Sequence, residues 1–170
     1  MIKDNKLLKK SVSLIGMAGA GKSSIAAKLS EIIDFSIIDS DLLIEKEYNK
    51  SLQGILDLEG YLKLREIEEQ ILLQINFNKI ILSTGGSAVY SKKAMDHLMQ
   101  NSTVFFLEVP FQKIIERVGD FSNRGFAKSP NQTIQEAFQE RELLYKKYSH
   151  HTIDNSSDMS SCITQILGHT

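Results

Sequence analysis

The stretch GMAGAGKSS, residues Gly16 to Ser24, constrains this chain more than any other part of its sequence. It follows the apolar run VSLI and precedes the helix-like run IAAKLSEII, so it marks a strand that gives way to a helix. The spacing matches G-x-x-x-x-G-K-[ST], the phosphate-binding loop of nucleotide-binding proteins. We favour this interpretation over a glycine-rich turn without a ligand because the expected strand and helix flank the loop.

The loop predicts which residues bind a nucleotide. Glycines allow consecutive backbone N–H groups to point at a phosphate, and the following helix offers its positive end. Lys22 adds a cation for the outer phosphates, and the hydroxyl of Ser23 can bind Mg²⁺. We therefore expect ATP to contact six residues: Gly19, Ala20, Gly21, Lys22, Ser23 and Ser24.

Short β-like runs alternate with helical patterns along the chain, which is typical of an α/β protein with a parallel sheet. The five runs are VSLIG near residue 12, FSIID near 35, KIILS near 79, TVFFLEV near 103 and HHTID near 150. With 170 residues, of which 42% are hydrophobic, the chain is long enough for one core. We therefore expect a single domain over residues 1–170.

Two segments interrupt this alternation. Between the second and third runs, over residues of about 41–76, apolar side chains recur at helical spacing, at Leu64, Ile67, Ile71 and Ile75. This pattern predicts a pair of helices inserted over the sheet. The second segment, GDFSNRGFAKSPN at residues 119–131, is long for a loop in a compact domain, and we expect it to form a lid.

Charge and cysteine content restrict the partners and the compartment. The 20 basic and 21 acidic residues give a net charge of −1, so we expect neither a nucleic-acid nor a membrane partner. The one cysteine, Cys162, cannot form an internal disulfide, which fits a reducing compartment. The N-terminal MIKDNKLLKK lacks the apolar core of a signal peptide, and no run reaches transmembrane length. These features predict a cytoplasmic protein, which we expect to be a monomer.

Carboxylates follow two of the predicted strands. Asp39 and Asp41 are two residues apart, so strand alternation would point both the same way, at the sheet edge where α/β proteins bind ligands. One could hold a Mg²⁺-bound water while the other takes the hydroxyl of an acceptor. The alternative is a helix N-cap followed by a solvated acid. Glu108, at the end of VFFLE, is a second Mg²⁺ candidate, and it could equally be a solvent-facing residue before the turn at Pro110.

Two arginines lie on predicted helices. Arg141 is three residues from both Phe138 and Leu144, on the apolar face of its helix. A buried guanidinium must be paired, either with an internal acid or with a ligand carboxylate that it binds through two N–H groups. Arg65 precedes Glu69 by one turn, so a surface ion pair is an alternative for this residue.

Taken together, these motifs resemble the shikimate kinase family over nearly the whole chain. The family pattern is a phosphate loop, a D-x-D, an arginine in a helix after an E-G pair, a strand ending in S-T-G-G-G, a lid arginine and a final arginine before L-Y. In this chain they read GMAGAGKSS, DSD, LEGYLKLRE, STGGSAVY, SNRGF and RELLY. The resemblance implies a three-layer P-loop fold with a five-stranded parallel sheet. It also implies Mg²⁺-dependent transfer of phosphate from ATP to the 3-hydroxyl of shikimate, a small carboxylate-bearing acceptor.

The resemblance implies roles on the nucleotide side of the site. Lys22 would serve the phosphates and be catalytic, and Ser23 and Asp39 would hold Mg²⁺ and its water shell. Arg124 would reach the transferring phosphoryl group from the lid, which makes it a second catalytic residue. Arg117 would lie against the adenine.

On the acceptor side, the resemblance implies five residues. Asp41 would orient or deprotonate the acceptor hydroxyl and so also be catalytic. Arg65 and Arg141 would bind the carboxylate of shikimate, and the backbone of Gly85 and Gly86 would pack against its ring.

Three positions depart from the family pattern. Ser87 replaces the third glycine, Gly125 replaces the proline after the lid arginine, and residues 155–157 are Asn-Ser-Ser where an adenine-side arginine is expected. Ser87 brings a side chain to a place where the ring and the backbone approach closely, so this departure bears on the identity of the acceptor.

Two alternative functions stay open at this point. One is a gluconate-kinase-like enzyme or another small-metabolite kinase, and the other is a nucleotide-binding regulatory module without acceptor activity. The joint presence of Asp41, Arg65 and Arg141 argues against the regulatory module, because a switch does not need an acceptor site.

Overall fold

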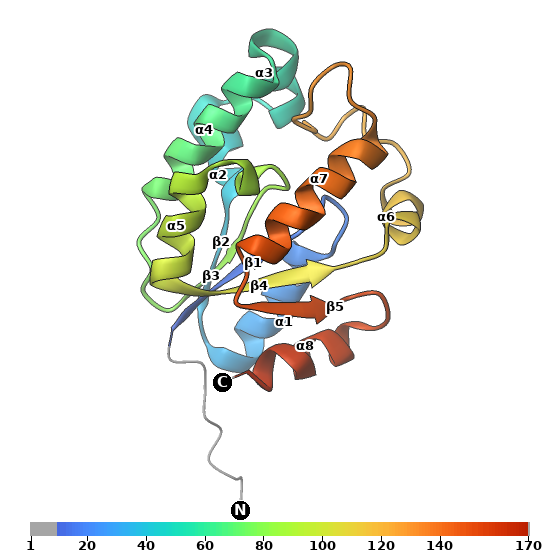
Figure 1. Ribbon diagram of the computed structural model, residues 1–170. Helices are drawn as coiled ribbons and strands as arrows, with labels where there is room; N and C mark the ends of the chain where they lie inside the picture. Colours follow the sequence, from blue (N-terminus) through green and yellow to red (C-terminus); the bar gives the residue numbers. More distant parts are fainter. Residues whose placement is uncertain (1–9, 170) are drawn as a thin grey trace, which may run out of the picture.

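Five parallel strands form the centre of the computed structural model, which describes residues 10–169 (Figure 1). Their order across the sheet is β2-β3-β1-β4-β5. The strands are β1 (Ser11–Ile15), β2 (Ser36–Asp39), β3 (Ile80–Ser83), β4 (Ser102–Glu108) and β5 (His151–Asp154). Each contains part of one of the five predicted runs, which confirms the predicted α/β fold with a five-stranded parallel sheet.

The central strand β1 shows why the apolar runs in the sequence predict the strands of this sheet. All five of its residues are buried, and it pairs with β3 on one side and β4 on the other. A parallel strand covered on both faces is apolar over its whole length, apart from groups that find partners inside. Ser13 is such a group, since its hydroxyl hydrogen-bonds that of Ser102 at 2.7 Å.

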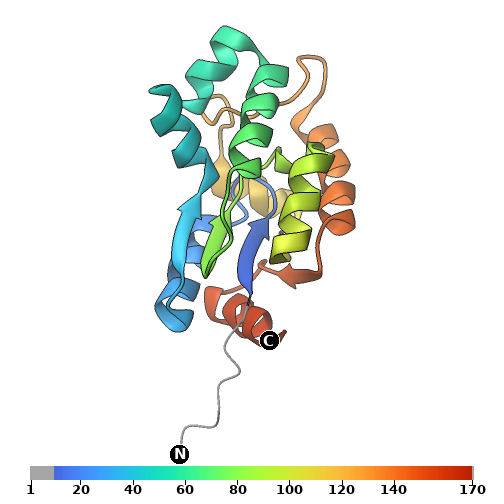
Figure 2. The same cartoon turned by 90° about the vertical axis from the view of Figure 1, so that its left-hand side faces the viewer.

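Helices cover both faces of the sheet and complete the three layers (Figure 2). On one face lie α1 (Lys22–Ile33) and α8 (Met159–Leu167), which pack against each other. On the other face lie α5 (Lys92–Asn101) and α7 (Ile134–Lys147). The single turn η1 (Ala88–Tyr90) lies beside α5 and α7, and α6 (Phe111–Val118) follows β4.

The inserted segment contains three helices, so the expected pair was wrong. They are α2 (Ser40–Tyr48), α3 (Leu52–Glu59) and α4 (Tyr61–Leu73). Asn49 ends α2 in a left-handed conformation with φ 49°, and Gly60, with φ 85°, separates α3 from α4. The apolar stripe is buried as expected, but Ile75 lies beyond the end of α4.

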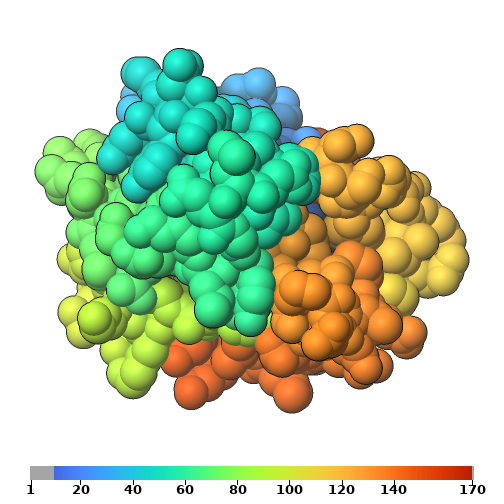
Figure 3. Space-filling model, turned by 90° about the horizontal axis from the view of Figure 1, so that it is seen from above, coloured from blue at the N-terminus to red at the C-terminus, as the bar shows by residue number. Residues whose placement is uncertain are grey.

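The segment between α6 and α7 contains neither helix nor strand and lies beside α3 and α4 when the molecule is viewed from above (Figure 3). No helix within residues 10–169 is long and apolar enough to cross a membrane. The expectation that the N-terminus is not a signal peptide concerns residues 1–9, which lie outside the described part of the chain.

Candidate active site

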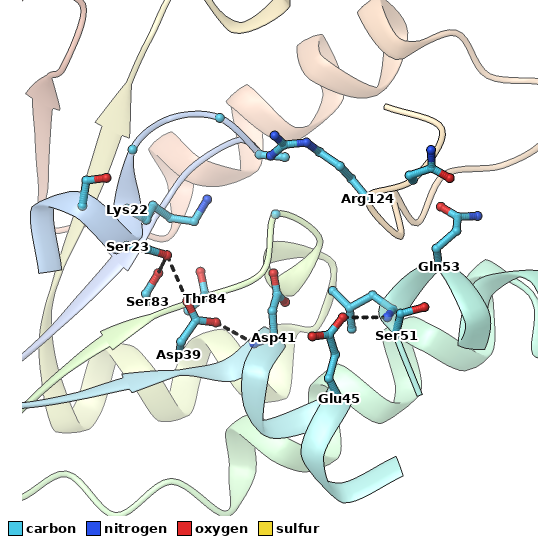
Figure 4. Close-up of a pocket in the computed structure, with 17 residues that line it drawn as sticks. Lys22, Ser23, Asp39, Asp41, Glu45, Ser51, Gln53, Ser83, Thr84 and Arg124 are labelled. Carbon is cyan, nitrogen blue, oxygen red and sulfur yellow. Dashed lines mark hydrogen bonds between the residues drawn. The ribbon is translucent and has the colours of Figure 1, made fainter. Parts of the chain in front are cut away.

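Residues that directly follow β1, β2 and β3 line a pocket of about 340 Å³ (Figure 4). This is the edge of a parallel sheet where α/β proteins bind ligands. The predicted site residues that line it are Gly19, Gly21, Lys22, Ser23, Ser24, Asp39, Asp41, Gly86 and Arg124. The fold thus brings the phosphate loop, the D-x-D and the lid arginine to one place.

The phosphate loop has the backbone that its glycines predict. Gly19 and Gly21 have φ values of 83° and 89°, a region that side chains disfavour. A Cβ atom on Gly19 would lie 2.4 Å from Cγ2 of Val118, so the loop is also closely packed. Gly21 is the N-cap of α1 and provides no side-chain oxygen to the first helical turn. The N–H groups of that turn can therefore receive an anion.

Lys22 is buried beneath this loop with its amine held by the loop itself. Its Nζ donates to the carbonyl oxygens of Gly16 at 2.7 Å and Met17 at 2.9 Å. Burial lowers the pKa of Lys22 to about 8, although the negative charges of Asp41, Asp39 and Glu68 oppose the shift. The lysine is thus a preformed positive charge at the floor of the pocket.

Ser23 and Asp39 place two side-chain oxygen atoms beside Lys22. The Ser23 hydroxyl donates to Oδ2 of Asp39 at 2.9 Å, and Oδ1 of Asp39 accepts from the backbone N–H groups of Asp41 and Leu42. Asp39 is therefore the N-cap of α2, which confirms the alternative N-cap role, and it also lines the pocket, while its role toward Mg²⁺ stays a prediction. Because β2 ends at Asp39 and Asp41 belongs to α2, strand alternation was the wrong reason for placing the two together.

Glu68 is a site residue that the sequence analysis missed. It is only 3% exposed, and burial raises its pKa to about 7. A Cβ atom on Gly85 would lie 2.2 Å from Oε1 of Glu68 and 2.6 Å from Oδ1 of Asp41, so these two carboxyl groups converge beside that glycine. Burial also raises the pKa of Asp41, to about 6, and this half-buried residue lines both pockets. Glu68 lies on the apolar stripe of α4, four residues after Leu64. A charged residue on an apolar helix face is unusual, so Glu68 could have been identified from the sequence.

Arg65 and Arg141 meet at the carbonyl oxygen of Ala127. Nη2 of Arg65 donates to it at 3.0 Å and Nη2 of Arg141 at 2.8 Å. The Nε atoms of both arginines are buried without a hydrogen-bond partner, and neither arginine forms an ion pair within residues 10–169. Glu69 accepts from Ser91 instead, so the alternative Arg65–Glu69 ion pair was wrong.

Aromatic rings support these two cations. The guanidinium carbon of Arg65 lies 3.5 Å from the ring centre of Tyr90, and that of Arg141 lies 4.1 Å from the ring centre of Phe126. Arg141 is 1% exposed, which confirms that it lies on the buried face of α7. Arg65 is half-buried, and its guanidinium and the buried one of Arg141, held by rings and one carbonyl, lack a counter-charge among the described residues. This arrangement suits a bound anion.

A second, smaller cavity of about 40 Å³ is lined by Arg141 and by the carboxyl pair of Asp41 and Glu68, whereas Arg65 lines neither this cavity nor the larger pocket. Gly85 and Gly86 form one wall of it, with the Gly85 N–H donating to Ser40 Oγ and the Gly86 carbonyl accepting from Tyr145. Residues 124–127 of the α6–α7 segment form another wall. A cavity of this size has room for a water molecule or two, so a larger acceptor requires this segment or the arginines to move.

Arg124 enters the larger pocket from the α6–α7 segment. Its side chain makes no hydrogen bond or ion pair with the described residues, and it extends toward the phosphate loop (Figure 4). Gly125 has a φ of 59°, and a proline, which requires a φ near −65°, could not adopt this backbone. The glycine at this position, where the family pattern has a proline, thus has a backbone conformation that proline could not adopt.

Arg117 and Asn155 hold the outer side of the phosphate loop. Arg117 donates to the carbonyl oxygens of Gly19 and Asn155, at 3.5 and 2.9 Å. The side-chain amide of Asn155 donates to the carbonyl of Ala20 at 2.6 Å. This supporting role was not predicted for either residue. Glu108, the alternative Mg²⁺ candidate, does not line either pocket and pairs with Lys146 at 3.0 Å.

Comparison with known proteins places this geometry in one family. The shikimate kinase family model matches residues 18–169. A shikimate kinase from Actinobacillus pleuropneumoniae serotype 5b is 31% identical over 158 residues, which cover 91% of each chain. A shikimate kinase from Haemophilus influenzae strain PittEE is 33% identical over 149 residues, which cover 85% of this chain and 83% of that one. The solved shikimate kinase from Acinetobacter baumannii in complex with shikimate is 25% identical, with a TM-score of 0.85 over 97% of this chain and 93% of that one.

The buried carboxyl of Glu68 generates a prediction about stability. Its pKa rises from an ordinary 4.5 to about 7 on folding, so between these pH values the folded state binds more protons than the unfolded state. The free energy of unfolding should therefore fall as the pH rises through this window, by up to about 3 kcal/mol for a shift of this size. Glu68→Gln should flatten that slope, as measured by urea unfolding from pH 4.5 to 8.

The control for this measurement is Glu69→Gln, the next residue of α4, which lines neither the larger pocket nor the smaller cavity. It should leave the slope as in the unmodified protein. An equal slope in Glu68→Gln and the unmodified protein would contradict the assignment of a proton to Glu68 at neutral pH.

Proposed function

Because the chain belongs to the shikimate kinase family, we propose that it transfers the γ-phosphoryl group of ATP to the 3-hydroxyl of shikimate. The observation that carries the proposal is the pair of guanidiniums of Arg65 and Arg141, whose Nε atoms are buried without a hydrogen-bond partner and which have no ion-pair partner among the described residues. Arg141 lines the small cavity together with the carboxyl groups of Asp41 and Glu68, and Arg65 meets Arg141 at the carbonyl of Ala127. A small acceptor with one carboxylate and several hydroxyl groups fits this combination.

On the nucleotide side, Lys22 and the first turn of α1 would bind the phosphates. Ser23 and Asp39 suit Mg²⁺, because they present a hydroxyl and a carboxylate oxygen 2.9 Å apart at the pocket wall. Mg²⁺ takes few protein ligands when phosphates and water complete its shell, and when bound it would neutralise charge on the phosphates. Arg117 would lie against the adenine as well as hold the loop.

On the acceptor side, Arg65 and Arg141 would bind the carboxylate, with Gly85 and Gly86 against the ring. Asp41 would then accept a hydrogen bond from the reacting hydroxyl and take its proton as the bond to phosphorus forms. Its raised pKa makes it a better base than an ordinary aspartate. Arg124 would stabilise the charge that develops on the transferring group.

The alternative functions have less support. A regulatory module without an acceptor would not need the Arg65–Arg141 pair or the buried carboxyl groups beside it. A gluconate-kinase-like or other metabolite kinase differs only in the acceptor, so the acceptor has to be tested directly. The monomeric state, the cytoplasmic location and the lack of nucleic-acid and membrane partners stay predictions.

The test of the function is ADP release with Mg²⁺ATP in the presence of shikimate, quinate, gluconate or a nucleoside monophosphate. Shikimate should give turnover well above the others. Turnover with only one of the other acceptors would show that this compound, and not shikimate, is the substrate. ADP release that no acceptor stimulates would favour the regulatory module.

Arg141→Lys should weaken acceptor binding selectively. Lysine keeps the charge but loses the planar pair of donors, so the KM for shikimate should rise about tenfold or more while the KM for ATP stays within about twofold. Steady-state kinetics and the melting temperature of the same preparation measure this. A destabilised variant with an unchanged KM for shikimate would show that Arg141 is structural.

Residues 119–131 should close over the site when both substrates are present. The side chain of Arg124 makes no hydrogen bond or ion pair with the described residues, so phosphates would give its guanidinium a partner and order the segment. Hydrogen exchange should slow in these residues on adding a non-hydrolysable ATP analogue with shikimate, with α8 as the internal reference. Equal exchange with and without ligands would argue against a closing lid.

A further inference from the structure

Ser87 stands at the junction of the acceptor pocket and α4, where the family pattern has a glycine. Its hydroxyl donates to Oε2 of Glu68 at 2.5 Å. Both residues line the small acceptor cavity. Within residues 10–169, this hydroxyl is the one hydrogen-bond donor to Glu68, so the orientation of that carboxyl group depends on it.

The second oxygen of Glu68 faces the reaction site. Oε1 is buried and has no hydrogen-bond partner among the described residues. It lies with Oδ1 of Asp41 beside Gly85, on the wall of the acceptor cavity. A buried acceptor atom without a donor is costly, and a hydroxyl group of a bound molecule would satisfy it.

The local backbone does not explain the serine. Ser87 has φ −96° and ψ −1°, values that any residue adopts. It is the N-cap of η1, but its side chain makes no capping hydrogen bond. Its one hydrogen bond to a buried side chain is the bond to Glu68, and this is the contact that a glycine could not make.

Resting on the proposed function, we propose that Ser87 is a positioning residue for the acceptor, which holds the Glu68 carboxyl group so that Oε1 faces a hydroxyl of shikimate beside Asp41. Without the serine hydroxyl, the Glu68 carboxyl group loses the one hydrogen-bond donor that it has among residues 10–169 and can rotate away. The loss should weaken acceptor binding without changing nucleotide binding, because Glu68 does not line the nucleotide pocket.

The test is a double-mutant cycle with Ser87→Ala and Glu68→Met, the latter a side chain of similar length that cannot replace the carboxyl as an acceptor. Ser87→Ala should raise the KM for shikimate about tenfold and leave the KM for ATP within about twofold. Ser87→Thr, which keeps the hydroxyl, should restore the KM for shikimate. The double variant should be no worse than Glu68→Met, because Ser87 acts only through Glu68.

Ser91 and Glu69 provide a matched control, since Ser91 Oγ donates to Glu69 Oε2 at the same 2.5 Å and joins the next residue of α4 to the start of α5. Ser91→Ala should lower the melting temperature, because Ser91 caps α5, and leave the KM for shikimate unchanged. Additive losses in the Ser87–Glu68 cycle would overturn the positioning role, and so would equal increases in the KM values for shikimate and ATP. Either result would leave the proposed function intact. A wild-type protein inactive with shikimate would overturn the proposed function, and this inference with it.

Discussion

The burial of Lys22 among carboxyl groups is the constraint on which the rest of the site depends. Its amine lies beneath the phosphate loop, and Asp41, Asp39 and Glu68 all act to raise its pKa against the effect of burial. Water screens such groups little, so each charge relies on its neighbours for stabilisation. Those neighbours come from the end of β2, from α2 and from α4. The inserted helices and the phosphate loop therefore form one electrostatic unit.

The strands and the phosphate loop could be predicted because their patterns have a direct physical cause. Strands buried on both faces must be apolar, and a loop that binds phosphate needs glycines at fixed positions. The number of inserted helices was predicted wrongly, because the prediction rested on one apolar stripe, which lies mostly on a single helix, α4. The breaks at Asn49 and Gly60 are ordinary helix-ending residues, and reading them would have separated the three helices.

The candidate site could be predicted where side chains carry the chemistry and not where the backbone does. Arg141 was identified from its place on an apolar face, and the same reasoning applied to α4 would have identified Glu68. The carbonyl of Ala127, which both arginines bind, has no counterpart in the sequence, because every residue has a carbonyl. The support of the loop by Asn155 likewise depends on how β5 ends beside β4 and the loop, which only the fold determines.

In the proposed function, the shared carbonyl of Ala127 would couple the acceptor site to the lid segment. Arg65 and Arg141 each use a donor on it, and the cavity that Arg141 lines with the carboxyl pair is about 40 Å³. A carboxylate that binds the two guanidiniums competes for these donors, since charged acceptors form stronger hydrogen bonds than a neutral carbonyl. If the two arginines bind the acceptor, its entry and the release of residues 124–127 from the arginines would therefore be linked steps. Because Arg124 belongs to that stretch, the position of the lid arginine would then depend on whether an acceptor is bound.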